Sequence, residues 1–269
     1  MRDKSQMKIV RRIMGISDEV SDFAIRSELS LLDSETQTSV LRLLLVHRLV
    51  NNEQDTLTVA MLNFPLVPGK ADSTEMQEAQ KQLATLGSYM DMEAFLDTPY
   101  QAAKNHLTCM ATEFMQSKHS ALAQTGTYNE KRYLKLKPQW GADEIILESS
   151  TCDVAAYIEM RSGIGSGMLG TFNCALCHHH LPESHHLLFE CKAMEKERTI
   201  MLAKVKLESP RAHNHLFGAL AGKWKLANAF LFGQAKDVCT MSGWNALTEN
   251  LMIFSSRAKT LLKEKSMVS

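Results

Sequence analysis

The segment from Cys174 to Cys191 constrains the chain more than any other, because it gathers metal-binding side chains within 18 residues. It reads CALCHHHLPESHHLLFEC and has the spacing C-x2-C-x8-H-x4-C. Two cysteines separated by two residues can grip one ion, since a tight turn brings both sulfurs to the same point. Zinc takes four tetrahedral nitrogen or sulfur ligands. The spacing therefore predicts one zinc ion held by four residues: Cys174, Cys177, His186 and Cys191.

The predicted zinc ion is structural, because four protein ligands leave no open position for a substrate. Its binding energy would be folding energy, since the loop has little core of its own. His185 is an alternative to its neighbour His186 as the histidine ligand. Three more histidines follow the second cysteine, and they read either as a solvated loop or as support for the ligands and a contact to phosphate or base: His178, His179 and His180. Buried thiols beside surface histidines are the interpretation without a metal.

The other cysteines and the apolar runs bear on the compartment. Of the six cysteines, the three outside the cluster are scattered along the chain, whereas a secreted disulfide framework is smaller and loop-rich. Met1 to Arg12 is polar and basic with no apolar stretch behind it, so no signal peptide is predicted. The longest apolar runs are too short to span a bilayer. We expect an intracellular protein in a reducing compartment, without membrane contact, with nucleus, cytoplasm and organelle all open.

Helical periodicity dominates the rest of the chain. Aromatic residues make up 7% and there are 16 methionines, which suits helix packing better than a β-sandwich. Apolar residues recur at steps of three and four in several segments: 34–52, 73–87, 99–114, 153–161, 190–206, 211–229 and 244–261. The β candidates are two short runs, Tyr133–Leu136 and Glu144–Leu147. The predicted fold is all-α, with helical layers and one small zinc knuckle inserted between helices.

Local signals predict several helix ends. Ser34 can act as an N-cap with Gln37 at the reciprocal capping position. Gly87 suits the end of the helix that begins near Ser73. Pro99 suits the first turn of the helix that follows it.

A basic and aromatic stretch separates two predicted regions. We expect an N-terminal helical region over 1–125, a connector over 126–142, and a helical region with the zinc knuckle over 143–269. The connector interleaves cations with aromatic rings, which can stack on bases while the cations meet phosphates. Its candidate nucleic-acid contacts are Lys131, Arg132, Lys135 and Trp140.

The residues around the knuckle resemble the zinc-binding segment that follows the polymerase in non-LTR retrotransposon reverse transcriptases. In that family a helix with an R-x-G step leads to C-x2-C, then to H-L-L-F-x-C, then to a helix carrying E-R. The matching positions here are Arg161, Gly163, Cys174, Cys177, His186, Leu187, Leu188, Phe189, Cys191, Glu197 and Arg198. Residues 11–35 and the following leucine-rich helix with His47-Arg48 resemble the helical region after the polymerase. Loosely, the resemblance covers residues 9 to about 235.

The polymerase itself has no counterpart in the sequence. A reverse transcriptase needs paired aspartates on a β-hairpin to hold two metal ions. The nearest string, Tyr89 to Met92, reads YMDM and lacks the second aspartate. We therefore expect no catalytic residues, no enzyme activity and no small-molecule substrate. The chain reads as a truncated or decayed element, or as a recruited fragment.

Balanced charge limits how such a chain could meet nucleic acid. Thirty basic and 30 acidic residues argue against coating nucleic acid with positive charge, but not against local basic patches. The expected contacts, beside those of the connector, lie around the knuckle: Arg161, His178, His179, Lys192 and Arg198. The expected function is a non-enzymatic zinc-binding protein that contacts RNA in preference to DNA, as a ribonucleoprotein component with other proteins as partners. The alternative is a structural subunit of a protein assembly in which zinc only staples the fold.

Overall fold

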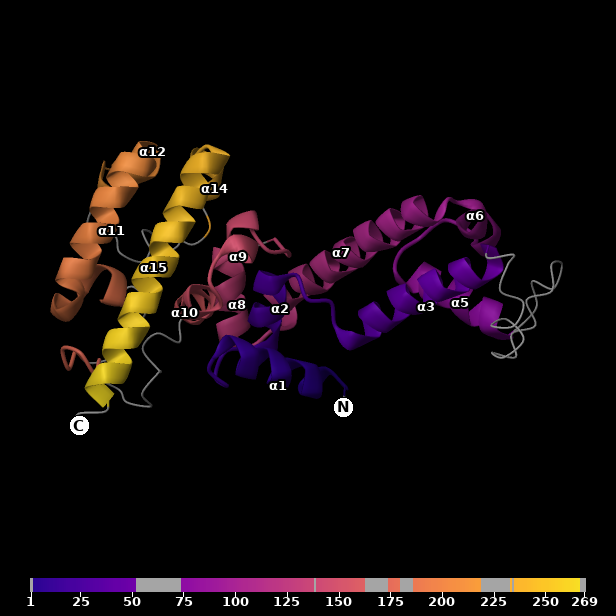
Figure 1. The fold of residues 1–269 in the computed structure, drawn as a ribbon, viewed down its shortest axis with the longest axis horizontal. Helices are drawn as coiled ribbons and strands as arrows, with labels where there is room; N and C mark the ends of the chain where they lie inside the picture. Colours follow the sequence, from indigo (N-terminus) through magenta and orange to yellow (C-terminus); the bar gives the residue numbers. More distant parts are fainter. Residues whose placement is uncertain are drawn as a thin grey trace. The chain divides into compact units, whose positions relative to one another are not determined.

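The structure, a computed structural model, describes residues 2–51, 74–137, 139–162, 174–179, 186–218, 233 and 235–266. Every regular element within these ranges is helical (Figure 1), so the all-α prediction is confirmed. None of the helices described is long and apolar enough to cross a membrane. Two compact units make up the chain. The split unit joins residues 3–31 to 119–269, and the middle unit contains residues 32–118.

The middle unit is a small helical cluster. Its elements are α3 (Ser34–Asn51), α5 (Thr74–Thr85), α6 (Met92–Asp97) and the first part of α7 (Tyr100–Thr125). Apolar side chains at helical spacing on these segments form one buried core: Leu43, Ala79, Leu83, Leu86, Met92, Phe95, Ala103, Leu107 and Met110. The predicted inward face of α7 is therefore the buried one over most of its length.

The start of α3 differs in detail from the prediction. The carboxylate of Asp33 accepts a hydrogen bond from the backbone N–H of Thr36 at 2.8 Å, which is the N-cap contact. Ser34 is thus the first helical residue rather than the cap. The predicted cap was wrong by one position, because Asp33 and Ser34 are both good caps.

Two other predicted helix ends are confirmed. Gly87 takes a φ of +93° just after α5, a conformation that glycine adopts without strain. The carbonyl of Pro99 accepts a hydrogen bond from the backbone N–H of Ala103 at 2.9 Å, so the proline sits at the entry of α7. The predicted start at Ser73, the predicted end at Asn52 and the stretch 219–229 lie outside the described residues.

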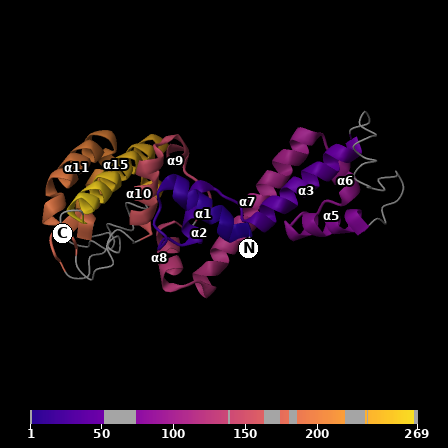
Figure 2. The ribbon, with the colours of Figure 1, turned by 60° about the horizontal axis from the view of Figure 1, so that its bottom comes forward.

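The split unit is built around the C-terminal helix, α15 (Met241–Ser266). The other helices of this unit are α1 (Arg2–Met14), α2 (Asp22–Leu29), α8 (Tyr128–Leu136), α9 (Glu144–Glu148), α10 (Thr151–Arg161), α11 (Glu195–Glu208), α12 (Pro210–Gly218) and α14 (Ala235–Val238), with short turns at His186–Glu190 and Lys192–Met194. Helix α15 contacts α9, α10, α11, α12 and α14, and it lies beside α11 in both views (Figures 1 and 2).

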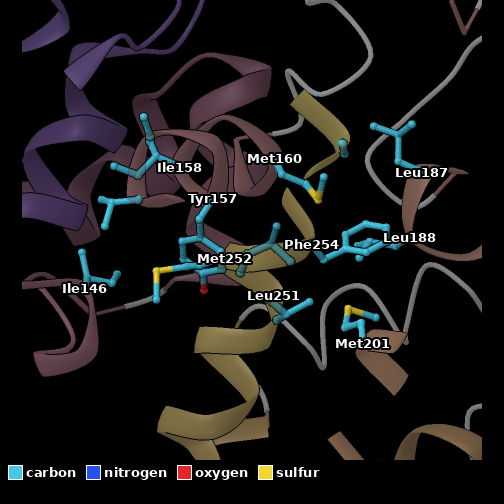
Figure 3. Packing of buried hydrophobic residues seen from close by; sticks show 14 of the residues in the cluster. Ile146, Tyr157, Ile158, Met160, Leu187, Leu188, Met201, Leu251, Met252 and Phe254 are labelled. Atoms are coloured by element: carbon cyan, nitrogen blue, oxygen red, sulfur yellow. The ribbon is translucent and has the colours of Figure 1, made fainter. Parts of the chain in front are cut away.

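The apolar stripe of α15 explains its central place. Trp244, Leu247, Leu251, Phe254 and Ala258 recur at steps of three and four, and all are buried. They pack with buried residues of α10 and α11 in a single core cluster. Figure 3 shows part of this cluster, with side chains from α9, α10, α11, α15 and the turn at His186–Glu190.

Both β candidates are helical, so this prediction was wrong. Tyr133–Leu136 lies in α8, and Glu144–Leu147 lies in α9. Runs of four residues are too short for periodicity to separate a strand from one helical turn. The deciding signal for α8 is upstream, where Thr127 and Glu130 form a capping box.

The boundaries of the two units differ from those of the three predicted regions. Residues 3–31 belong with 119–269, although 32–118 separates them in sequence. A buried ion network supplies one reason: Glu28 of α2 contacts Lys137 and Arg161 at 3.0 and 3.1 Å. The predicted connector is an integral part of the split unit, because α8 lies inside it and buries Tyr133 and Leu136 in the main core.

Candidate metal centre

The four predicted ligands come together. The ligand atoms of Cys174, Cys177, His186 and Cys191 all lie within 4.8 Å of one another and could hold one metal ion. The sulfurs of Cys174 and Cys191 are 4.0 Å apart, and Cys177 Sγ is 3.2 Å from Nε2 of His186. Of the two candidate histidines, His186 lies in the cluster, and His185 lies outside the described residues.

The first two cysteines sit on one tight turn. The backbone N–H of His178 donates to the carbonyl of Cys174 at 2.6 Å, and the N–H of Cys174 donates to the carbonyl of His179 at 2.8 Å. These bonds close the chain around both sulfurs. His178 ends the turn with a φ of +59°, in the left-handed region that few residue types favour. Its main contribution is therefore the direction of the backbone.

The second pair of ligands depends on a widened helical turn. Residues His186–Glu190 form a π-helical turn, and the N–H of Cys191 donates to the carbonyl of His186 at 2.7 Å. In an α-helix, residues five apart point roughly 140° away from each other. A π-turn, with about 4.4 residues per turn, reduces this angle to roughly 50°. Within helical backbone, the H-x4-C spacing thus suits one metal better when the turn is widened in this way.

The ligand segment is anchored by its own apolar residues. Leu187 and Leu188, between the two ligands, are 1% and 0% exposed. They belong to the same core as Met201 of α11 and Phe254 of α15 (Figure 3). The site is therefore attached to the main core, which agrees with a metal that fixes the fold locally.

Arg198 of α11 anchors the metal loop, which comprises the described ligand segments 174–179 and 186–191. Its guanidinium donates from Nε to the carbonyl of Leu188 at 2.8 Å and from Nη2 to the carbonyl of Cys191 at 2.6 Å. The adjacent Glu197 pairs with Arg257 of α15 at 3.6 Å. The E-R pair noted in the sequence is thus used for internal contacts. Arg198 was predicted to contact nucleic acid, but both of these donors are directed at the chain itself.

His186 is oriented by a carboxylate. Its Nδ1 lies 3.4 Å from the Glu190 carboxylate, which leaves Nε2 directed at Cys177. A carboxylate on the second ring nitrogen is the usual partner of a metal-bound histidine, because it fixes the tautomer and the ring orientation. His179 is exposed and stacks its ring on that of His186, with centroids 4.5 Å apart.

The residues fit a tetrahedral metal ion. Bonds of about 2.3 Å to sulfur and about 2.0 Å to nitrogen place the ligand atoms of a zinc site roughly 3.5–3.8 Å apart. The measured separations of 3.2 and 4.0 Å fall on either side of this range. A hydrogen bond from the Cys191 thiol lowers the pKa of Cys174, and the same contact raises the pKa of Cys191. The two sulfurs thus share one proton between them, and an ion bound to both would displace it, since metal ligands bind as thiolates.

Arg161 is not a surface residue. It is 2% exposed, pairs with Glu28, and donates from Nη2 to the carbonyl of Leu136 at 3.1 Å. The Glu28 carboxylate is also buried, and it accepts a hydrogen bond from Tyr133 at 2.7 Å. Burial alone would raise the pKa of Glu28, but Arg161 and Lys137 outweigh burial, so the pKa is lowered. Arg161, predicted to meet nucleic acid, is part of this buried network and also lines a cavity.

The remaining candidate contacts are dispersed. Three are exposed around the knuckle, His178, His179 and Lys192, and the acidic Glu190 and Glu195 are exposed in the same stretch. In the connector, Lys131 is half-buried, Lys135 is exposed and Trp140 is 9% exposed, while the side chain of Arg132 is not described. His180 and Gly163 lie outside the described residues.

The structure brings three of these candidates together in one cavity of about 480 Å³: Lys135, Trp140 and Arg161. Other lining residues that the sequence did not single out are Lys137, Asp143, Lys236 and Trp244. Lys236 and Asp143 form an ion pair at 2.8 Å. The basic character of the connector was visible in the sequence, but nothing there placed Lys236, about 100 residues later, beside it.

Comparisons with known proteins return no match: no family model, no curated protein and no solved structure matches the chain.

Proposed function

We propose that this chain is a non-enzymatic RNA-binding protein whose fold is stapled by one structural zinc ion. The observation that carries the RNA part is the cavity on the split unit. Lys135 and Trp140 were chosen from the connector and Arg161 from the helix before the knuckle, and all three line this cavity together with two further cations, Lys137 and Lys236. Cations and aromatic rings in one place are the combination that meets a phosphate backbone and its bases.

Zinc is the metal that the ligands support best. Three thiolates and one imidazole form a soft, closed set, the composition of structural zinc sites. With all four positions taken by protein, the ion has no place for a reacting water or substrate. Its role in the proposal is to hold the turn at Cys174–Cys177 against the widened turn at His186–Glu190, and thereby to fix the start of α11.

The resemblance to the region after the polymerase of non-LTR reverse transcriptases supports RNA rather than DNA as the partner. In this proposal the chain keeps the binding part of such a protein without its catalytic part. Binding rests on a local cavity, so the neutral total charge is no obstacle. The expected affinity is modest and falls with salt in proportion to the few phosphates contacted.

The test combines metal analysis with RNA binding on the full chain purified from its source cell. We expect about one zinc per chain, and bound RNA that is released by nuclease together with its protein partners. Purified chain should bind single-stranded RNA, and Lys135→Ala should weaken binding. Lys204→Ala, an exposed lysine of α11 away from the cavity, is the matched control. Zinc-loaded chain with no affinity for RNA would refute the RNA part and leave the zinc part standing.

One observation favours the second candidate function, a structural subunit of a protein assembly. The exposed Glu190 and Glu195 interrupt the basic surface around the knuckle, while Ile200 and Leu207 of α11 are 47% and 81% exposed. Such residues suit contact with another protein better than contact with phosphate. Partners that stay bound after nuclease, on a chain free of RNA, would select this function.

A further inference from the structure

We propose that the cavity lined by Lys135, Arg161 and Trp244 is a binding site for a phosphate group carried by a nucleotide. The site lies on the split unit, where the end of α8 and the loop after it meet the end of α10, Gly233 and the start of α15. The choice of RNA as the natural source of that phosphate rests on the proposed function above. The anion site itself rests on the charge, the donors and the size of the cavity.

The charge of the cavity favours an anion. Among the described residues, four cationic side chains line it: Lys135, Lys137, Arg161 and Lys236. Two carboxylates oppose them, Asp143 in the wall and Glu28 paired with Lys137 and Arg161, so these six groups carry two positive charges in excess. Burial would raise the pKa of Asp143, but Lys137 and Lys236 lower it, so this carboxylate is ionised and already counted. The excess favours a ligand that carries about two negative charges, as a phosphate monoester does near neutral pH.

The four cations differ in whether they are already paired with a carboxylate. Lys137 and Arg161 are buried and bonded to Glu28, so they supply a fixed positive field. Lys236 is exposed and paired with Asp143 at 2.8 Å. Lys135 is exposed at the cavity, and its ammonium has no ion pair within the described residues. An incoming phosphate would therefore meet one free ammonium at the rim and a preformed field behind it, the arrangement that binds anions most strongly.

The wall of the cavity also holds an unpaired donor. Trp244 is 2% exposed, and its indole Nε1 has no hydrogen-bond partner among the residues described. Buried donors normally have an acceptor, and leaving one unpaired costs free energy. A phosphate oxygen is a strong acceptor for such a donor.

The size of the cavity suits a phosphate with a sugar and base attached. Its volume of about 480 Å³ exceeds the space a lone phosphate fills and lies within the range of small-molecule sites. One wall is close-fitting backbone: a Cβ added at Gly233 would lie 2.1 Å from the carbonyl oxygen of Leu136. Only glycine lets these two segments approach so closely, which keeps the cavity beside Arg161 defined.

The experiment uses zinc-loaded full chain and follows its indole N–H signals by ¹H–¹⁵N NMR. The three tryptophans give three signals, and Trp140→Phe and Trp224→Phe assign the one from Trp244 by elimination. Uridine 5′-monophosphate should shift the Trp244 signal saturably, whereas uridine, which has no phosphate, should not. Lys135→Ala and Lys236→Ala should each weaken binding of the nucleotide about tenfold. Lys204→Ala is the control and should leave binding unchanged.

The outcomes separate this inference from the proposed function. A Trp244 signal that stays fixed at millimolar nucleotide, in variants whose free spectra match the native one, overturns the inference even if RNA binds elsewhere. An equal response to uridine overturns the phosphate assignment. A saturable response to the nucleotide without affinity for RNA supports the site and identifies free nucleotide as its source. Stronger binding of 5′-phosphorylated than of 5′-hydroxyl RNA, lost in Lys135→Ala, supports the site with RNA as the source.

Discussion

Replacing Glu28 with glutamine should strongly destabilise the split unit, because the substitution removes the only carboxylate that both Lys137 and Arg161 contact among the described residues. The Glu28 carboxylate is fully buried and binds three partners: Lys137 at 3.0 Å, Arg161 at 3.1 Å and the hydroxyl of Tyr133 at 2.7 Å. Glutamine preserves the shape but removes the carboxylate that pairs directly with two buried cations, which leaves Asp143 as a less direct counter-charge. Breaking a buried ion pair from one side costs about 3–5 kcal/mol, because the remaining charge stays desolvated.

The same carboxylate should determine how the free energy of unfolding falls at acidic pH. Its pKa is lowered in the folded chain, because Arg161 and Lys137 outweigh the opposing effect of burial. A group with a lowered folded pKa stabilises fully above its unfolded pKa, about 4.3 for glutamate, and loses this contribution as pH falls through the folded value. Stability of the native chain should therefore fall below about pH 4.3, and Glu28→Gln should flatten that part of the curve.

The assay is urea unfolding followed by circular dichroism, at pH 7 and at intervals down to pH 3, with the metal content held constant. Glu148→Gln, an exposed glutamate of α9, is the matched control and should change the free energy of unfolding by less than about 0.5 kcal/mol. In a Lys137→Met background, Glu28→Gln should lower the free energy of unfolding by less, because one of the two cations that lose their direct partner is already absent. A cost for Glu28→Gln below about 1 kcal/mol with an unchanged acid limb would refute the network as a source of stability.

Three further predictions concern the metal loop. Glu190→Gln should weaken metal binding about 10- to 100-fold in competition with a chelator, because the histidine ligand loses its orienting carboxylate; unchanged affinity would contradict this role. Arg198→Met should lower the free energy of urea unfolding of the metal-loaded chain by about 1–3 kcal/mol, and Arg198→Lys should not restore it, because one ammonium cannot reach both carbonyls in the same way. His178→Val should cost about 1–2 kcal/mol in the same assay while His178→Gly costs little, because only glycine is unstrained at positive φ; equal effects would exclude a backbone role.

Much of the metal centre could be predicted because its signal is local. The spacing from Cys174 to Cys191 identified the four residues that the structure brings together, since residues close in sequence cannot lie far apart. Helices were predictable for the same reason, because the apolar periodicity of α15 and the glycine after α5 act within a few turns. The π-turn was not predictable, because the H-x4-C spacing does not fix the backbone conformation between the two ligands.

The internal partners of the cations were not predictable. Arg161 and Arg198 were expected to contact nucleic acid, and a sequence displays a cation without the groups that face it inside the fold. For Arg161 the counterpart is Glu28, 133 residues away, and for Arg198 it is two backbone carbonyls that no residue type reveals. Lys236 was missed for the same reason. Charged residues cannot be divided between surface and interior until the segments that face them are known.

The split unit also determines when the chain can fold during its synthesis. Residues 3–31 leave the ribosome before the segments they pack with, which begin at residue 119, beyond the whole middle unit. At about 5–20 residues per second, Glu28 waits on the order of ten seconds before Arg161 is made. The apolar side of α2, with Ala24 and Ile25, stays uncovered during that time while the middle unit can already close on itself. This order of segments implies a slow, late folding step in which residues 3–31 pack against the segments after residue 118. It also implies a period in which residues 3–31 are accessible to a chaperone.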